Sequence, residues 1–178
     1  MFQIDISAEL LFFIFALGCF AGWLLEVIFR SIKKWKPVNP GLLRGPYLPI
    51  YGFGVVFLFA VSAMEISVMA KYVLIVITPT VVELVGGLFF VRYYGIKLWD
   101  YSQEFLNFKN IICLKFSIYW GLLALVFYKL IFPLLLKTIS LINNKLVMIL
   151  IAVFMITVTT DFLITFKKRI EQSIKWKI

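Results

Sequence analysis

Long runs of apolar residues, separated by short polar segments, dominate the chain. Five runs are predicted to be membrane-spanning helices, with expected bounds of 10–29, 48–63, 72–91, 116–136 and 146–166. A helix needs about 20 apolar residues to cross the hydrocarbon core, so every run is close to sufficient except the second, which is short. In an alternative interpretation the second run is re-entrant, which would reverse every later span. The predicted fold class is an all-α integral membrane protein with about five transmembrane helices, in a single domain of residues 1–178.

The positions of Lys and Arg predict the orientation of these helices. Fourteen of the 18 lie in alternate segments, namely the loops 30–47 and 92–115 and the tail 167–178. The other four are Lys71, Lys129, Lys137 and Lys145. Cytoplasmic loops are enriched in Lys and Arg, so the pattern predicts an external N-terminus, a cytoplasmic C-terminus and cytoplasmic loops 30–47 and 92–115. A re-entrant second run would place the basic residues 167–169 outside, which the same rule disfavours.

Composition agrees with a membrane protein and removes several kinds of chemistry. Hydrophobic residues make up 63% of the chain and charged residues 15%, more apolar surface than a soluble domain of this size can bury. The net charge of +9 follows the topology, and no nucleic-acid partner is expected. The chain has no histidine, and Cys19 and Cys113 have no metal-ligand neighbours. We therefore expect no metal site, no cofactor in this chain and no structural disulfide.

Three acidic residues interrupt the apolar runs: Glu26, Glu83 and Asp161. A charge inside the bilayer costs at least about 2.5–3.5 kcal/mol, so each acid calls for a partner or a function. Their distances from the following basic residues place all three in the cytoplasmic half of the membrane. The sequence predicts that they line one cavity open to the cytoplasm. The alternative is local pairing, with Glu26 and Arg30 spaced i,i+4 at a helix end and Asp161 bonded to a nearby threonine or lysine.

The segment around Glu83 has unusual helix chemistry. Pro79 removes a backbone donor, and Gly86 and Gly87 weaken the helix or admit a close neighbour. Broken helices around a buried polar residue build the mid-membrane sites of many transporters. The pattern therefore indicates either a broken helix at a binding site or a kinked helix that packs tightly through its glycines.

The segment 39-NPGLLRGPYLPIYGFG-54 is too rich in Pro and Gly to form a regular helix before residue 50. Irregular backbone at membrane depth is tolerated where protein or water satisfies its polar groups. We expect this loop to fold back under the bundle, with Arg44 pairing with Glu26 or Glu83, although an exposed turn is the alternative. The loop-motif residues are Asn39, Gly41, Gly45, Pro46, Tyr47, Pro49, Tyr51 and Gly52.

A second cytoplasmic segment, 98-LWDYSQEFLNF-108, has apolar residues at helical spacing. Leu98, Tyr101, Phe105 and Phe108 recur at intervals of three and four, which predicts a short amphipathic helix on the membrane surface. The helix is either a membrane-surface linker or a docking site for a soluble partner. The docking hypothesis assigns partner contacts to Trp99, Asp100, Tyr101 and Glu104.

Over about residues 10–136 the chain resembles the type IV ABC-transporter permease family of the CmpB type. The similar stretches are 22-GWLLEVIFR-30, 39-NPGLLRGPYLPIYGFG-54, 82-VELVGG-87, 98-LWDYS-102 and 107-NFKNIICLKFSIYWG-121. Asn110 stands where the family pattern usually has glycine. The resemblance implies a small multi-pass protein of the bacterial plasma membrane that couples to a cytoplasmic ATPase.

Three functions remain open at this stage. The leading hypothesis is a permease subunit whose polar site contains Glu26, Glu83, Asp161 and Arg44. The chain has no P-loop, so ATP hydrolysis would come from a partner chain. Five helices are few for a substrate pathway, which implies a homodimer or a second membrane subunit. The alternatives are an enzyme acting on a lipid-linked substrate, for which no catalytic residues are assigned, and a scaffold or regulator that does not transport.

Overall fold

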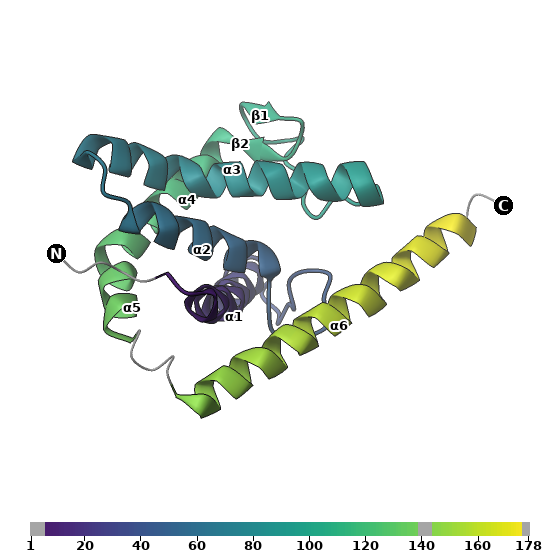
Figure 1. The fold of residues 1–178 in the computed structure, drawn as a ribbon. Helices are drawn as coiled ribbons and strands as arrows, with labels where there is room; N and C mark the ends of the chain where they lie inside the picture. Colours follow the sequence, from purple (N-terminus) through teal and green to yellow (C-terminus); the bar gives the residue numbers. More distant parts are fainter. Residues whose placement is uncertain (1–5, 139–143, 176–178) are drawn as a thin grey trace.

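The computed structural model describes residues 6–138 and 144–175, and the protein is 75% helical (Figure 1). Helices α1 (Ala8–Lys34), α2 (Pro49–Ala63) and α3 (Val68–Tyr94) follow one another along the chain. The next helix starts as α4 (Leu114–Val126), passes through one π-helical turn, η1 (Phe127–Ile131), and continues as α5 (Phe132–Thr138). Helix α6 spans Lys145–Lys175. A short hairpin of β1 (Asn107–Phe108) and β2 (Ile112–Cys113) precedes α4.

Four helices are long and apolar enough to cross a membrane: Ala8–Lys34, Val68–Tyr94, Leu114–Thr138 and Lys145–Arg169. Helix α2 is a shorter apolar helix of 15 residues, or about 22 Å at 1.5 Å per residue. These five elements coincide with the five apolar runs of the sequence. Of the predicted tail 167–178, residues up to Lys175 continue α6, and 176–178 lie outside the described residues.

Local sequence explains where the helices begin and end. The side chains of Ser7 and Ser67 accept hydrogen bonds from Leu10 N and Ala70 N at the starts of α1 and α3, as N-cap residues do. Pro49 occupies the first turn of α2, where its missing N–H is not needed. Gly95 ends α3 in the left-handed conformation, with φ of 64°.

Helix α3 is continuous through Pro79, so of the two alternatives the structure favours a helix that packs through its glycines over a helix broken around Glu83. One missing N–H removes a single backbone hydrogen bond, and the flanking turns of this 27-residue helix remain intact. The π-helical turn lies instead in the next span, just before Pro133.

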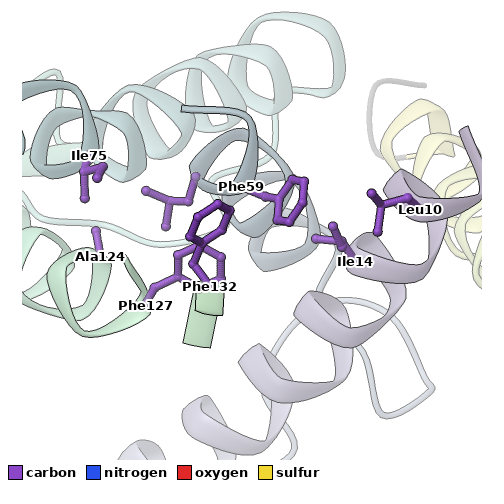
Figure 2. Packing of buried hydrophobic residues seen from close by; sticks show 8 residues of the cluster. Leu10, Ile14, Phe59, Ile75, Ala124, Phe127 and Phe132 are labelled. Carbon is purple, nitrogen blue, oxygen red and sulfur yellow. The ribbon is translucent and has the colours of Figure 1, made fainter. Parts of the chain in front are cut away.

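Consecutive helices pack in order, α1 on α2, α2 on α3 and α3 on α4, and α6 passes along one side against α1 (Figure 1). The main core joins α1, α2, α3, α4 and α5, and none of the described residues of α6 contributes to it. Figure 2 shows the side chains of Leu10, Ile14, Phe59, Ile75, Ala124, Phe127 and Phe132 converging there. Many other large apolar side chains face outward, as expected where lipid or another membrane subunit replaces water.

The predicted amphipathic helix over 98–108 is absent; turns and strand β1 occupy this segment. The carboxylate of Asp100 accepts from Ser102 N at 2.9 Å, and the amide of Asn107 donates to Glu104 O at 3.0 Å. Such short polar side chains offer the backbone an alternative to helical hydrogen bonds. The hairpin turn contains Asn110 with φ of 60°. Asparagine and glycine both adopt that conformation readily, so the exchange at this position preserves the turn.

Candidate functional site

A cavity of about 430 Å³ lies among α1 to α4, the loop before α2 and part of α6. Its volume is within the range of small-molecule sites. Most of its lining is apolar, and its polar side chains come from several elements. They are Glu26, Arg30, Tyr51, Glu83, Trp99, Tyr101 and Trp120.

Glu26 is fully engaged by neighbouring residues. Its Oε1 accepts from Arg30 Nε at 2.6 Å, and its Oε2 accepts from Tyr51 Oη at 2.7 Å. Tyr51 reaches Glu26 from the first turn of α2, and its ring packs directly over Gly22 of α1. A β-carbon at position 22 would overlap that ring, so glycine at this position allows the tyrosine to meet the acid.

Glu83 is buried, with 6% of its surface exposed, and is only half satisfied. Its Oε1 accepts from Tyr101 Oη at 2.8 Å. Its Oε2 forms no hydrogen bond within residues 6–138 and 144–169, and neither does the buried indole N–H of Trp120, which lies beside the Glu83 carboxyl group. Both residues line the cavity. Buried polar atoms are normally paired, so a buried carboxyl oxygen that forms no hydrogen bond marks this cavity as a candidate binding site.

Tyr101 is held in place on both sides. Its ring stacks on Phe116 with centroids 4.7 Å apart, and its hydroxyl reaches Glu83. Burial, reinforced by the neighbouring Glu83 carboxylate, raises the pKa of Tyr101. The hydroxyl therefore keeps its proton and remains the donor. Gly87 helps this arrangement, because a side chain there would overlap Ile111 of the hairpin segment.

Asp161 lies apart from the other two acids, on α6 against the Gly/Pro-rich loop. Its Oδ2 accepts from the backbone N–H groups of Arg44 at 2.7 Å and Gly45 at 3.2 Å, and from Tyr47 Oη at 2.7 Å. Burial, followed by the Asp161 carboxylate, raises the pKa of Tyr47 to about 12, so this hydroxyl also stays a donor. Asp161 and Arg44 line a second, more open hollow.

The four residues predicted to share one site are therefore divided between two places. Glu26 and Glu83 line the cavity between α1 and α4, and Asp161 and Arg44 do not. The cation that meets Glu26 is Arg30 of the same helix. Sequence position alone gave similar depths for the acids but no information on which faces of the helices they occupy.

The Gly/Pro-rich loop folds into the protein. Leu48 N donates to Cys19 O at 3.0 Å, near the middle of α1, so the loop returns along α1 before α2 begins. Asn39 Oδ1 accepts from Trp23 Nε1 at 2.7 Å, and Gly41 has φ of 89°. Gly52 packs against Cys19 and Phe15, while Pro46 is exposed. Helix α2 therefore begins beside the middle of α1.

A family model described as "Putative ABC-transporter type IV" matches residues 13–166. The chain belongs to this ABC-transporter family. The match confirms the resemblance and includes Glu26, Glu83 and Asp161. No curated protein and no solved structure matched the chain.

In this ABC-transporter family member the four residues predicted to contact a partner are divided between the protein interior and the surface. Trp99 Nε1 donates to Ile111 O at 2.7 Å, and Tyr101 faces the cavity. Asp100 pairs with Lys97 at 3.0 Å and Glu104 with Lys115 at 3.2 Å. The exposed apolar residues of this segment are Phe105, Leu106 and Phe108.

Sequence reasoning missed the tyrosines as acid partners and Trp120 as a cavity residue. Each of the three acids accepts one tyrosine hydroxyl, in the pairs Glu26–Tyr51, Glu83–Tyr101 and Asp161–Tyr47. A usable signal was the presence of all three tyrosines in the two irregular segments. Among the side chains that the structure describes, in 6–138 and 144–169, no three Cys, Asp or Glu residues converge to hold a metal ion.

Proposed function

We propose that this chain is the membrane subunit of an ABC transporter, and that its substrate occupies the cavity containing Glu26 and Glu83. The observation that carries the proposal is the half-satisfied Glu83 in a cavity of about 430 Å³. A helix-packing residue would be expected to have both carboxylate oxygens paired. Membership of an ABC-transporter family supports transport over a purely structural role.

The proposed orientation has the N-terminus outside and the C-terminus in the cytoplasm, with all five apolar helices crossing the bilayer. The Lys and Arg distribution supports it. The cavity then opens toward the cytoplasmic half of the membrane, because Glu26 is close to Arg30 at the cytoplasmic end of α1. Substrate entry or release would take place on that side.

A separate cytoplasmic ATPase supplies the energy in this proposal. Its docking surface would be the segment between α3 and α4, where Phe105 is 74% exposed and Leu106 64% exposed. Trp99 and Tyr101 of the same segment contact the α3–α4 region and Glu83. Movement of a docked ATPase would therefore be transmitted directly to the acid in the cavity.

A second membrane chain completes the pathway, either another copy of this chain or a different subunit. The outward-facing apolar side chains of α6, which include Leu150, Val153 and Ile156, would face lipid or that second chain. Helix α6 forms part of the cavity wall and also carries these exposed apolar side chains. This arrangement supports assembly with a second chain over action as a monomer.

The test is affinity purification of the tagged chain from native membranes in mild detergent. Mass spectrometry and vanadate-sensitive ATP hydrolysis are measured on the eluate. We expect a stoichiometric ATP-binding partner, which Phe105→Ser depletes. The matched control is Met69→Ser, an 80% exposed apolar residue at the other end of α3. An eluate with neither the partner nor the hydrolysis would overturn the proposal.

A further inference from the structure

We infer that the cavity is selective for amphipathic amines, molecules with an apolar body and a protonated amine that pairs with Glu83. The inference rests on the proposed function, because it names the substrate class of the same site. It depends on the charge balance, the aromatic lining and the apolar walls of the cavity.

The charge balance of the cavity leaves one carboxyl group, that of Glu83, without a cation. Arg30 neutralises Glu26, and Tyr51 satisfies the second oxygen of that acid. Glu83 receives only the neutral hydroxyl of Tyr101, and within the described part of the chain no lysine or arginine forms an ion pair with it. A buried carboxylate is stabilised by a hydrogen-bonding cation. A ligand ammonium group beside Oε2 supplies both the charge and the donor.

Aromatic residues also line the cavity. The aromatic lining residues are Tyr51, Trp99, Tyr101 and Trp120. The rings of Tyr51 and Trp120 pack edge to face, with centroids 5.6 Å apart. Aromatic faces attract ammonium groups, most strongly where water is excluded. An anionic head would meet the open Oε2 of Glu83, so the lining opposes carboxylate and phosphate ligands.

The rest of the lining suits an apolar body. Apolar side chains from four different helices line the same cavity. They are Leu25, Val82, Phe90, Leu123 and Phe162. Such a surface gains about 25 cal/mol for each Å² of ligand surface that leaves water, whatever the detailed shape of the ligand. Apolar contacts would therefore set affinity broadly, and Glu83 would set the preference for an amine.

The test uses dansylcadaverine, which joins an aromatic body to a primary amine, and the dansyl amide of pentylamine, which has the same body without the amine. Each is titrated into the purified full-length chain in neutral-lipid nanodiscs. Energy transfer from tryptophan to the dansyl group reports binding. We expect the amine to bind at least tenfold more tightly than the neutral amide. Equal binding of the two probes would overturn the inference.

Two comparisons assign the preference to Glu83. Glu83→Gln should remove the tenfold preference, whereas Glu65→Gln, at an exposed acid between α2 and α3, should retain it. A preference that persists in a folded Glu83→Gln variant would overturn the inference. If that variant does not fold, competition on the wild type decides: unlabelled hexylamine should displace dansylcadaverine and hexanol should not, and equal displacement by both would overturn the inference.

This experiment is separable from the test of the proposed function. Probe binding is measured on the isolated chain, while ATPase recovery is measured on native membranes. Amine preference without a copurifying ATPase would support the ligand class and overturn transport. A copurifying ATPase without amine preference would support transport and overturn the ligand class.

Discussion

Tyr101 Oη donates a hydrogen bond of 2.8 Å to Glu83 Oε1, joining the segment after α3 to the buried acid within α3. The same relationship occurs twice more, between Tyr51 and Glu26 and between Tyr47 and Asp161, each at 2.7 Å. A neutral donor lowers the cost of burying an acid without filling its remaining acceptor positions. At Glu83 this leaves Oε2 open, which is the basis of the proposed binding site.

Replacing Tyr101 with Phe should destabilise the protein and loosen the segment between α3 and α4. The substitution leaves Glu83 Oε1 without its donor, and an unsatisfied buried acceptor costs about 1–3 kcal/mol. Thermal unfolding of the purified variant in detergent should show a lower midpoint than wild type. Tyr93→Phe is the control, because Tyr93 lies on the same side of the protein and is 69% exposed. Equal midpoints for wild type and Tyr101→Phe would contradict the structural role of this hydrogen bond.

Gly22 and Gly54 provide a matched pair of glycine-to-alanine substitutions within helices. At Gly22 the new methyl group would overlap the Tyr51 ring and displace its hydroxyl from Glu26. At Gly54 no atom lies within 4 Å of the added carbon. Alanine is favoured over glycine in a helix by about 0.5–1 kcal/mol. Gly22→Ala should therefore lower the unfolding temperature, and Gly54→Ala should leave it unchanged or raise it.

The comparison of the two glycines also isolates the position of Tyr51. If Gly22→Ala is as stable as Gly54→Ala, Tyr51 does not pack over α1 as described. Pairing Gly22→Ala with Tyr51→Ala gives a further check, because removing the ring should relieve the overlap. The double variant should then lose less than the sum of the two single losses, as expected for residues in direct contact.

The helices were predictable because apolar runs of about 20 residues have few alternatives. The acids were also visible in the sequence, and the pairing of Glu26 with Arg30 followed from their i,i+4 spacing. The structure does not place Asp161 with the other two acids. The depth of a residue along a helix does not determine which way its side chain faces. The prediction of a helix over 98–108 was wrong, because apolar spacing takes no account of side chains that form turns, here those of Asp100 and Asn107.

Asp161 should hold the Gly/Pro-rich loop against α6. Its carboxylate accepts the backbone N–H groups of Arg44 and Gly45, so Asp161→Ala removes the acceptor of both. Hydrogen exchange followed by mass spectrometry should show at least about tenfold faster exchange in the peptide containing these residues, because local opening no longer breaks two charge-assisted hydrogen bonds. Asp100→Ala is the control, since Asp100 lies in the other irregular segment.

Unchanged exchange at residues 44 and 45 in Asp161→Ala would show that the loop is held by its apolar contacts alone. Those contacts are substantial, because Leu43 and Tyr47 are buried with Val158 and Phe166. Asp161→Asn should give an intermediate rate, because the amide oxygen still accepts but carries no charge. The order wild type, Asn, Ala in increasing exchange rate is therefore the expected result.

The proposed orientation predicts opposite labelling of two introduced cysteines. Glu65→Cys places a thiol in the exposed segment between α2 and α3, and Phe105→Cys places one in the exposed segment between α3 and α4. The native Cys19 and Cys113 are buried, so the wild type supplies the baseline. A membrane-impermeant maleimide applied to intact cells should label position 65 and not position 105. After lysis both positions should react, which shows that each thiol is accessible. Labelling of position 105 alone in intact cells would reverse the proposed orientation. Labelling of both positions, or of neither, would place the two ends of α3 on the same side, which would mean that α3 does not cross the membrane.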